Sequence, residues 1–523
     1  MFRVFSPRKL PLRKFSITSV LGEAQDISKL PLSVPLPQFS AASSSQKSSI
    51  VPPYSADVSV LDNKIRVASQ EHFGDYCTIG LAIESGSRFE ALHPTGTSHI
   101  VEKLAFGANA KQSSREEIYE VLERNGGLID CQSTRDTFIY AASCHIDGLD
   151  EVMEVIANSV WRPRVTDDEF KEAQMIVEFE NEDMAHKIEC EPLITDWIHT
   201  AAFRGNTLGF SKYTKNEALA KITKKDVLTF MSLYHRPERI VVAGIGIPHD
   251  QLRETTQRYF NYNTAIWNTN PEILTSKIPS IDNSVAQYTG GEIRVQKDLS
   301  KIAVGTPYPH LAHVGLGFEG CSYKDDDFVT MCVIQSLLGG GGSFSAGGPG
   351  KGMYTRLYTE VMNQYHWIYS CIAYNHSYAD SGLFCIHAAC PPEGVNYALQ
   401  VILDQFIRLS KGVAKDELSR AKIQLKSQLM MNLEIRPVMF EDLARQVIGH
   451  GKRRLPMEYM EQIDRVTAED IMRVGQRLLA GKPSLVGYGV IDTLASYSQL
   501  EDAAAQRNPD LLEKKNKIFS WQS

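Results

Sequence analysis

Ile79-Gly-Leu-Ala-Ile-Glu-Ser-Gly-Ser87 is matched much later in the chain by Val314-Gly-Leu-Gly-Phe-Glu-Gly-Cys-Ser322. Each segment is an apolar run that ends in small residues, which is typical of a strand that runs into a turn. Two copies of one segment so far apart indicate an internal repeat. The sequence therefore predicts a chain built from two similar halves.

A second pair of matching segments lies toward the end of each half. Ile222-Thr-Lys-Lys-Asp-Val227 matches Val466-Thr-Ala-Glu-Asp-Ile471, and in both an aspartate follows the threonine by three residues. A threonine N-cap with an acid in the first turn is typical of a helix start. After each predicted helix come a basic turn with proline and a short apolar strand, 240–245 in the first half and 484–488 in the second.

Because strands and helices alternate irregularly, we expect an α/β (α+β) fold of two duplicated domains, each a mixed sheet with helices packed on it. The predicted segments are residues 1–15 as a targeting peptide, 16–54 as a Ser/Pro-rich linker, 55–270 as the N-terminal domain, 271–285 as an interdomain linker, 286–500 as the C-terminal domain and 501–523 as a tail.

Composition excludes several classes of protein. The net charge of −7 gives no support for a nucleic-acid partner. The nine cysteines include no CxxC pair, which argues against a disulfide framework and fits a reducing compartment. No run of 18 apolar residues occurs, so a membrane span is not expected.

The N-terminal segment differs from the rest of the chain. Before Glu23 it contains serines and no acid, and its basic residues are Arg3, Arg8, Lys9, Arg13 and Lys14. This composition is typical of a mitochondrial transit peptide, with a disordered basic tail as the alternative. Arg13-Lys14-Phe15-Ser16 suggests cleavage after Phe15, and we expect the mature chain in the mitochondrial matrix.

The segment around Gly96-Thr-Ser-His99-Ile-Val-Glu102-Lys103 contains an incomplete zinc motif. In HxxEH, two histidines one turn apart hold zinc, and the glutamate is the general base. His99 and Glu102 fit, but Lys103 replaces the second histidine, and an ammonium has no lone pair for a metal. Glu180, in the acidic stretch 176–183, is the best candidate for a further ligand.

With two protein ligands where a catalytic zinc site uses three, we predict no tight zinc and no hydrolysis by this chain alone. Two alternatives stay open. His99 could be an ordinary buried histidine in a chance HxxE, or the chain could be an active metallopeptidase with an unusual ligand set.

Residues 339–352 form a glycine-rich loop in which eight of fourteen residues are glycine. The loop follows an apolar helical run, 328–338, and precedes a segment, 353–357, that could be helical. It lacks the G-x-x-x-x-G-K-[ST] pattern, so nucleotide binding is not expected. A loop of exposed backbone with one aromatic residue can hold a peptide, and a plain linker is the alternative. The candidate peptide-binding residues are Gly339, Gly340, Gly341, Gly342, Ser343, Phe344, Gly347, Gly348, Gly350, Lys351 and Gly352.

The chain resembles the pitrilysin-type (inverzincin) peptidases over nearly all of residues 55–500, and more closely their non-catalytic alpha-type subunits. The closest stretches are 99–106, Tyr288-Thr-Gly-Gly291 and 338–357. The resemblance implies two homologous α/β domains that face a central cavity. It also implies that His99, Lys103 and Glu180 are vestigial ligand positions, that Glu102 is the former base position, and that residues 339–352 are a substrate-recognition loop.

The resemblance further implies a heterodimer with a catalytic beta subunit, which would hold the zinc, while this chain would need no cofactor. The expected substrates are basic presequences of imported precursors, handled in the matrix, with peripheral association to the inner membrane as a further expectation. Carboxylates suit arginine, and the acidic clusters are 178–183, Glu189, Glu191 and 325–327, although all could be ordinary surface acids. The alternative function is that of a structural core subunit of the respiratory cytochrome bc1 complex.

Overall fold

The computed structural model describes residues 54–187, 190–304, 309–342 and 353–513, all of them in the compact unit Tyr54–Ser523. Several predictions lie outside the described residues: the targeting peptide 1–15, residues 16–53 of the linker, Glu189, residues 343–352 of the glycine-rich loop, and residues 514–523 of the tail.

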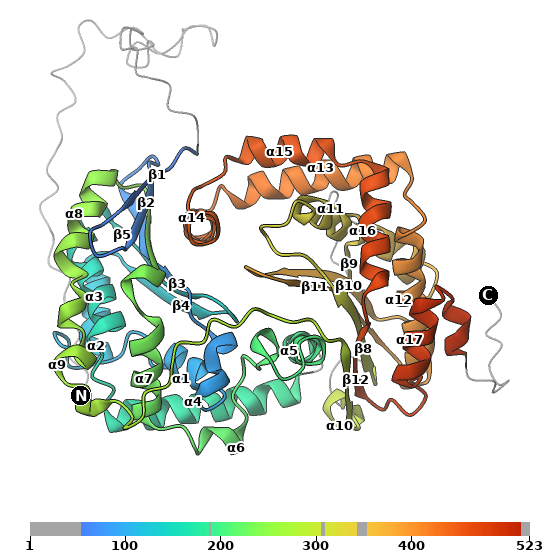
Figure 1. Cartoon of the computed structure of the whole chain (residues 1–523), viewed down its shortest axis with the longest axis horizontal. Coiled ribbons are helices and arrows are strands. Elements are labelled where there is room, and N and C mark those ends of the chain that lie inside the picture. Colours follow the sequence, from blue (N-terminus) through green and yellow to red (C-terminus); the bar gives the residue numbers. More distant parts are fainter. Residues whose placement is uncertain (1–53, 188–189, 305–308, 343–352, 514–523) are drawn as a thin grey trace, which may run out of the picture. The chain divides into compact units, whose positions relative to one another are not determined.

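The first half of the described chain contains a six-stranded sheet in the order β1-β2-β6-β3-β5-β4 (Figure 1). The strands are β1 Asp57–Val60, β2 Arg66–Gln70, β3 Tyr76–Ile83, β4 Leu128–Ser133, β5 Phe138–His145 and β6 Ile240–Ile245. β2 and β6 pair in parallel, and the other neighbours in this sheet pair antiparallel. The sheet is therefore mixed.

The second half contains a six-stranded sheet in the order β7-β12-β8-β11-β10-β9. The strands are β7 Gly291–Gln296, β8 Ala312–Glu319, β9 Gly340–Gly342, β10 Ser370–Ser377, β11 Gly382–Cys390 and β12 Ser484–Gly489. β7 and β12 pair in parallel, and the other neighbours pair antiparallel.

The repeated sequence segments occupy equivalent places in the two sheets. β3 lies between β6 and β5, and β8 lies between β12 and β11, in each case with antiparallel pairing. β6 and β12, the strands predicted to follow the matching helices, each make a parallel pairing on their other side. The prediction of two duplicated α/β domains with mixed sheets is confirmed.

Helices cover the sheets and connect their strands. In the first half they are α1 Thr97–Lys103, α2 Arg115–Arg124, α3 Leu149–Trp161, α4 Asp167–His186, α5 Glu191–Ala202, α6 Asn216–Leu219, α7 Lys224–Tyr234, α8 His249–Tyr259 and α9 Ile266–Thr269. In the second half they are α10 Ser300–Ala303, α11 Phe328–Leu338, α12 Val395–Leu409, α13 Lys415–Asn432, α14 Arg436–His450, α15 Pro456–Arg465, α16 Ala468–Ala480 and α17 Tyr497–Ala505.

Short helical turns complete the connections. The 3₁₀ turns are η4 Ser87–Leu92, η5 Ile146–Gly148, η6 Thr207–Gly209, η7 Pro237–Arg239, η8 Tyr262–Thr264, η9 Pro271–Ile273, η11 Pro392–Gly394 and η12 Pro509–Leu512, and η10 Leu357–Met362 is a π-helix. The helix that the sequence suggested over 353–357 is instead a turn that leads into η10 at Leu357.

The two matching helix starts form as predicted. Thr223 caps α7, and its side chain accepts a hydrogen bond from the backbone N–H of Asp226, whose carboxylate returns to the backbone of Thr223. Thr467 and Asp470 make the same capping box at the start of α16. Each box satisfies backbone donors that the first turn of a helix leaves without partners.

Each half also contributes one helix that packs on the sheet of the other half. α14, from the second half, packs Met439, Phe440 and Leu443 on one face of the first sheet. α5, from the first half, packs Ile194 and Ile198 on one face of the second sheet. Because each helix covers apolar sheet surface that would otherwise meet water, the exchange joins the two halves.

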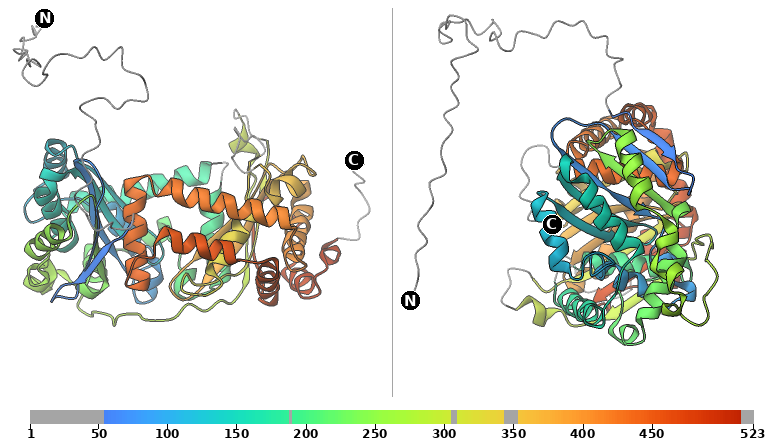
Figure 2. Two further views of the ribbon diagram at one scale, coloured as in Figure 1. Left: turned by 90° about the horizontal axis from the view of Figure 1, so that it is seen from above. Right: turned by 90° about the vertical axis from the view of Figure 1, so that its left-hand side faces the viewer.

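The chain reaches the first sheet and returns from it along a pair of helices. α13 leads away from the second half, α14 lies across the first sheet, and α15 leads back beside α13 (Figures 1 and 2).

Among the described helices, none is both long enough and apolar enough to span a bilayer.

A cavity of about 800 Å³ lies where the two halves meet. Its wall includes Arg88 and Asp136 from the first half and Tyr323 and Asp380 from the second. A bidentate ion pair between Arg88 and Asp380, with a shortest distance of 2.7 Å, joins the halves at this wall. The predicted central cavity thus has a counterpart in the structure.

Candidate functional site

The short helix α1 carries the incomplete zinc motif, and a buried carboxylate fixes its first turn. Glu90 accepts hydrogen bonds from the backbone N–H groups of Gly96 (2.6 Å) and Ser98 (2.7 Å) and from the Ser98 hydroxyl (2.5 Å). Burial raises the pKa of Glu90 to about 7, against the lowering effect of these hydrogen bonds. A negative group suits this position because the N-terminus of a helix is electropositive.

Gly96 allows α1 to start in a crowded place. Its φ is 93°, in the left-handed region, and a Cβ there would lie 2.2 Å from the hydroxyl oxygen of Thr214. Glycine is therefore required at this position. Thr214 in turn donates its hydroxyl to the Gly96 carbonyl, which ties the loop after η6 to the start of α1.

His99 is 1% exposed and bonded through both ring nitrogens. The backbone N–H of Thr214 donates to Nδ1 at 3.3 Å, so Nδ1 is an acceptor and the ring proton lies on Nε2. Nε2 lies 3.1 Å from Glu180 Oε2 and donates to it. The Nε2 lone pair that a zinc ligand would need is thus replaced by an N–H bond to a carboxylate.

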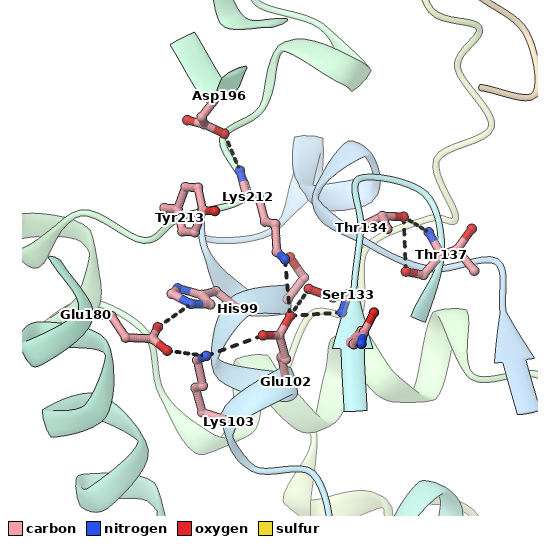
Figure 3. A network of polar contacts seen from close by, with 12 residues as sticks. His99, Glu102, Lys103, Ser133, Thr134, Thr137, Glu180, Asp196, Lys212 and Tyr213 are labelled. Atoms are coloured by element: carbon pink, nitrogen blue, oxygen red, sulfur yellow. Dashed lines mark hydrogen bonds and ion pairs between the residues drawn. The ribbon is translucent and has the colours of Figure 1, made fainter. Parts of the chain in front are cut away.

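Lys103 lies between two carboxylates (Figure 3). Its Nζ is 2.6 Å from Glu180 Oε1 and 3.3 Å from Glu102 Oε1, and its side chain is 17% exposed. Burial works to lower the pKa of Lys103, but the hydrogen bond to Glu180 and the charges of Glu102 and Glu180 outweigh it and raise the pKa. The ammonium therefore stays protonated and cannot bind a metal.

Glu102, at the position of the general base, is in contact with two lysines and with Ser133. It accepts hydrogen bonds from the backbone N–H of Ser133, at 3.0 Å, and from the Ser133 hydroxyl, and Lys212 Nζ is 3.8 Å away. Burial would raise the pKa of Glu102, but Lys212, Ser133 and Lys103 lower it. The carboxylate is ionised but already engaged by cations and donors.

Glu180 comes from α4 and completes the network. Burial would raise its pKa, but the hydrogen bonds from His99 and Lys103 lower the pKa to about 2. The structure therefore brings together all four residues singled out in the sequence: His99, Glu102, Lys103 and Glu180.

These residues do not fit a zinc ion. The histidine proton and the lysine ammonium both point at Glu180, so the carboxylate that would bind a metal is neutralised by protein donors. Among the described residues, no cluster of three or more His, Cys, Asp or Glu side chains is placed to hold a metal ion.

Sequence reasoning missed Lys212, Ser133 and Glu90, since none of them belongs to a recognisable motif. Lys212 lies in a loop whose backbone is fixed by Asp196, which accepts from the Lys212 N–H at 3.0 Å and from the Ser211 hydroxyl at 2.7 Å. Arg135 pairs with Asp196 at 2.6 Å, and both side chains are buried. Lys212 is thereby aimed at Glu102 (Figure 3).

The first glycines of the predicted recognition loop are packed. Gly339 and Gly340 have φ of 55° and 98°, and a Cβ on Gly340 would lie 2.0 Å from the Cys371 carbonyl. A Cβ on Gly341 would lie 2.1 Å from the Tyr358 hydroxyl, whereas one on Gly342 would meet open space. β9, the edge strand of the second sheet, pairs with β10, so residues 340–342 form a fixed base for the loop.

Several of the acidic residues considered in the sequence are engaged elsewhere. Asp325 and Asp327 form ion pairs with Arg473 and Arg477 on α16, at distances from 2.7 to 3.0 Å. Asp326 makes no ion pair among the described residues. The stretch 325–327 thus mainly fastens α16 to the loop before α11.

Comparisons with known proteins give a consistent picture. Residues 66–214 match the family model described as insulinase (peptidase family M16), and residues 221–425 match the peptidase M16 inactive domain. The mitochondrial-processing peptidase subunit alpha of Caenorhabditis elegans is 52% identical over 491 residues, which cover 94% of this chain and 95% of that protein. The subunit of the same name from Bos taurus is 42% identical over 497 residues, covering 95% and 92%. That from Solanum tuberosum is 29% identical over 483 residues, covering 91% and 87%.

Proposed function

The chain belongs to the M16 peptidase family, among its mitochondrial-processing peptidase alpha subunits, and we propose on this basis that it is the non-catalytic, substrate-handling subunit of a peptidase that removes presequences. The observation that carries the proposal is the ammonium of Lys103 between Glu102 and Glu180. A cation built into the chain neutralises the carboxylates that would otherwise bind zinc and activate water. A catalytic beta subunit would supply the zinc chemistry.

In this assignment the chain contributes binding surface and its partner contributes cleavage. We assign residues 339–352 as the recognition loop, because its described base is anchored on both sides. Gly340 donates its N–H to the Thr355 hydroxyl at 3.1 Å, and Arg356 makes a bidentate pair with Glu417 on α13. A loop with a fixed base can present exposed backbone to a peptide at a defined place.

The cellular setting follows from the same family membership. The relatives are mitochondrial by name, so we place the chain in the mitochondrion. Removal of residues 1–15 on import, residence in the matrix and peripheral contact with the inner membrane belong to the proposal. The respiratory bc1 core alternative is not favoured, since the relatives described above are processing-peptidase subunits.

The test is reconstitution with purified subunits. The chain, its catalytic partner and the pair are each incubated with a precursor that carries a presequence. We expect cleavage by the pair and none by the chain alone. A pair that lacks residues 343–349 of this chain keeps strand β9 and should assemble normally but bind the precursor more weakly. Undiminished precursor binding after this deletion would refute the recognition role of the loop.

A further inference from the structure

One face of α4 is exposed along its whole length and combines apolar with acidic side chains. Its exposed residues are Asp167, Asp168, Lys171, Glu172, Met175, Glu178, Phe179, Glu182, Asp183 and His186. They recur every three or four residues, which places them on a single stripe of the helix. Ala173 and Val177 are buried on the opposite side, so the stripe faces away from the core.

Two large apolar side chains lie along the middle of this stripe. Phe179 is 67% exposed and Met175, one turn earlier, is 51% exposed. The rotation of 100° per residue puts Glu178 and Glu182 on one side of this pair and Glu172 and Asp183 on the other. Exposed neighbouring apolar residues with a polar rim are typical of an interaction surface.

The carboxylates on the stripe differ in how far they are already neutralised. Asp183 pairs with Lys187, and Glu172 lies 3.9 Å from Arg115. Glu178 and Glu182 make no ion pair with any other described side chain. The side of the stripe that holds these two residues also holds the exposed Lys171, so it carries two carboxylates against one ammonium, a net negative charge, beside the exposed phenyl ring and thioether.

We propose that this stripe binds a basic amphipathic helix, the form expected of a presequence, and the proposal rests on the function assigned above. The apolar face of such a helix would cover Met175 and Phe179. Its arginines would form forked hydrogen bonds with Glu178 and Glu182, and one could stack on the Phe179 ring. Charge complementarity thus selects a cationic occupant.

The stripe and the vestigial site lie on different sides of α4. The same helix supplies Glu180 to the network of His99 and Lys103, but Glu180 lies beside the buried Ala173 and Val177, about 160° around the helix from Glu178 and Glu182. The ion pair between Glu180 and Lys103 holds α4 against α1 and so fixes the stripe relative to that site.

The experiment uses the complex of this chain with its catalytic partner. The probe is a fluorescently labelled amphipathic peptide that carries arginines, and the comparison peptide has glutamines in their place. Glu178→Gln with Glu182→Gln should weaken binding of the arginine peptide about fivefold and flatten its salt dependence. Met175→Ala with Phe179→Ala should weaken binding about tenfold.

Two matched controls remove similar groups elsewhere. Glu254→Gln on α8 removes an exposed carboxylate that has no ion pair among the described residues, and Ile423→Ala on α13 removes a side chain that is 62% exposed. Both should bind the peptide as the unchanged complex does. Stripe variants that behave like these controls would overturn the proposal and leave the function standing.

Two further outcomes are decisive. Stripe variants that lose assembly with the catalytic partner, measured by size-exclusion chromatography, while the assembled fraction binds peptide normally, would assign the surface to the partner subunit and overturn the proposal. An unchanged complex that binds neither peptide would contradict the proposed function itself. Weaker binding of the arginine peptide alone, with assembly intact, supports the stripe as its site.

Discussion

Lys103 Nζ lies 2.6 Å from Glu180 Oε1 and 3.3 Å from Glu102 Oε1, so a single ammonium links α1 to α4. A histidine at this position would offer a lone pair, whereas the lysine offers protons to the same carboxylates. The structural task of the motif, to hold the two helices together, is kept without a metal. The remaining contacts, from His99 and Lys212, reinforce this arrangement.

Lys103→Met should destabilise the chain by about 2 kcal/mol, because it leaves Glu102 and Glu180 with less compensating charge in a half-buried place. The measurement is urea unfolding, monitored by circular dichroism. Lys111→Met, which breaks an exposed ion pair with Glu154, is the control and should change stability by less than about 1 kcal/mol. Equal effects of the two substitutions would contradict the network described here.

Glu90 should make stability depend on pH. Its folded-state pKa is raised from 4.5 to about 7, so the folded chain holds the proton more tightly than the unfolded chain. The corresponding stabilisation, about 3 kcal/mol, is present below pH 4.5 and is lost as the pH rises through 7.

The side chain of the Glu90→Gln variant cannot titrate. Between pH 5 and pH 8 the unfolding free energy of the unchanged chain should therefore fall relative to that of the variant. Unfolding curves at several pH values measure that difference. A difference that stays constant over this range would show that Glu90 is already ionised at low pH.

At the base of the glycine-rich loop, Gly340 is enclosed by its neighbours and Gly342 is not. Gly340→Ala should cost about 3 kcal/mol, because the new Cβ would overlap the Cys371 carbonyl at a φ of 98°. Gly342→Ala meets open space and should cost little. Thermal unfolding of the two variants compares them directly, and a tolerated Gly340→Ala would contradict the described strand β9.

The exchanged helices should make the two halves unfold together. Phe440→Ala on α14 removes a ring that is 1% exposed and packed on the first sheet, at a cost of about 4 kcal/mol. Met457→Ala on α15, where the side chain is 59% exposed, is the control. Calorimetry should show one transition that moves down for Phe440→Ala, whereas a split into two transitions would mean that the halves are independent.

Much of this architecture could be read from local sequence signals. The threonine–aspartate boxes at Thr223 and Thr467, the strand 240–245 and the helix 328–338 appear in the structure where they were predicted. Each depends on chemistry within a few residues, such as a side chain that caps its own helix. The predicted domain boundaries and the peptide-binding role of the loop stay predictions.

Other features depend on contacts between distant residues and left no local signal. Lys212 reaches Glu102 only because Asp196 fixes its loop. Helices α5 and α14 each pack on the sheet of the other half, so their positions depend on residues from both halves. Glycines 339–341 were assigned to a loop of exposed backbone, but Thr355, Cys371 and Tyr358 approach them closely and enclose them. Composition alone cannot distinguish a glycine that is free from one that is enclosed.

The ammonium of Lys103 should exclude a catalytic metal from this chain. The most direct measurement is the zinc content of the purified solitary chain by mass spectrometry, taken together with its activity on a presequence-bearing precursor. We predict zinc far below one ion per chain and no cleavage until the partner is added. One tightly held zinc per chain, with cleavage by the chain alone, would contradict this role of Lys103.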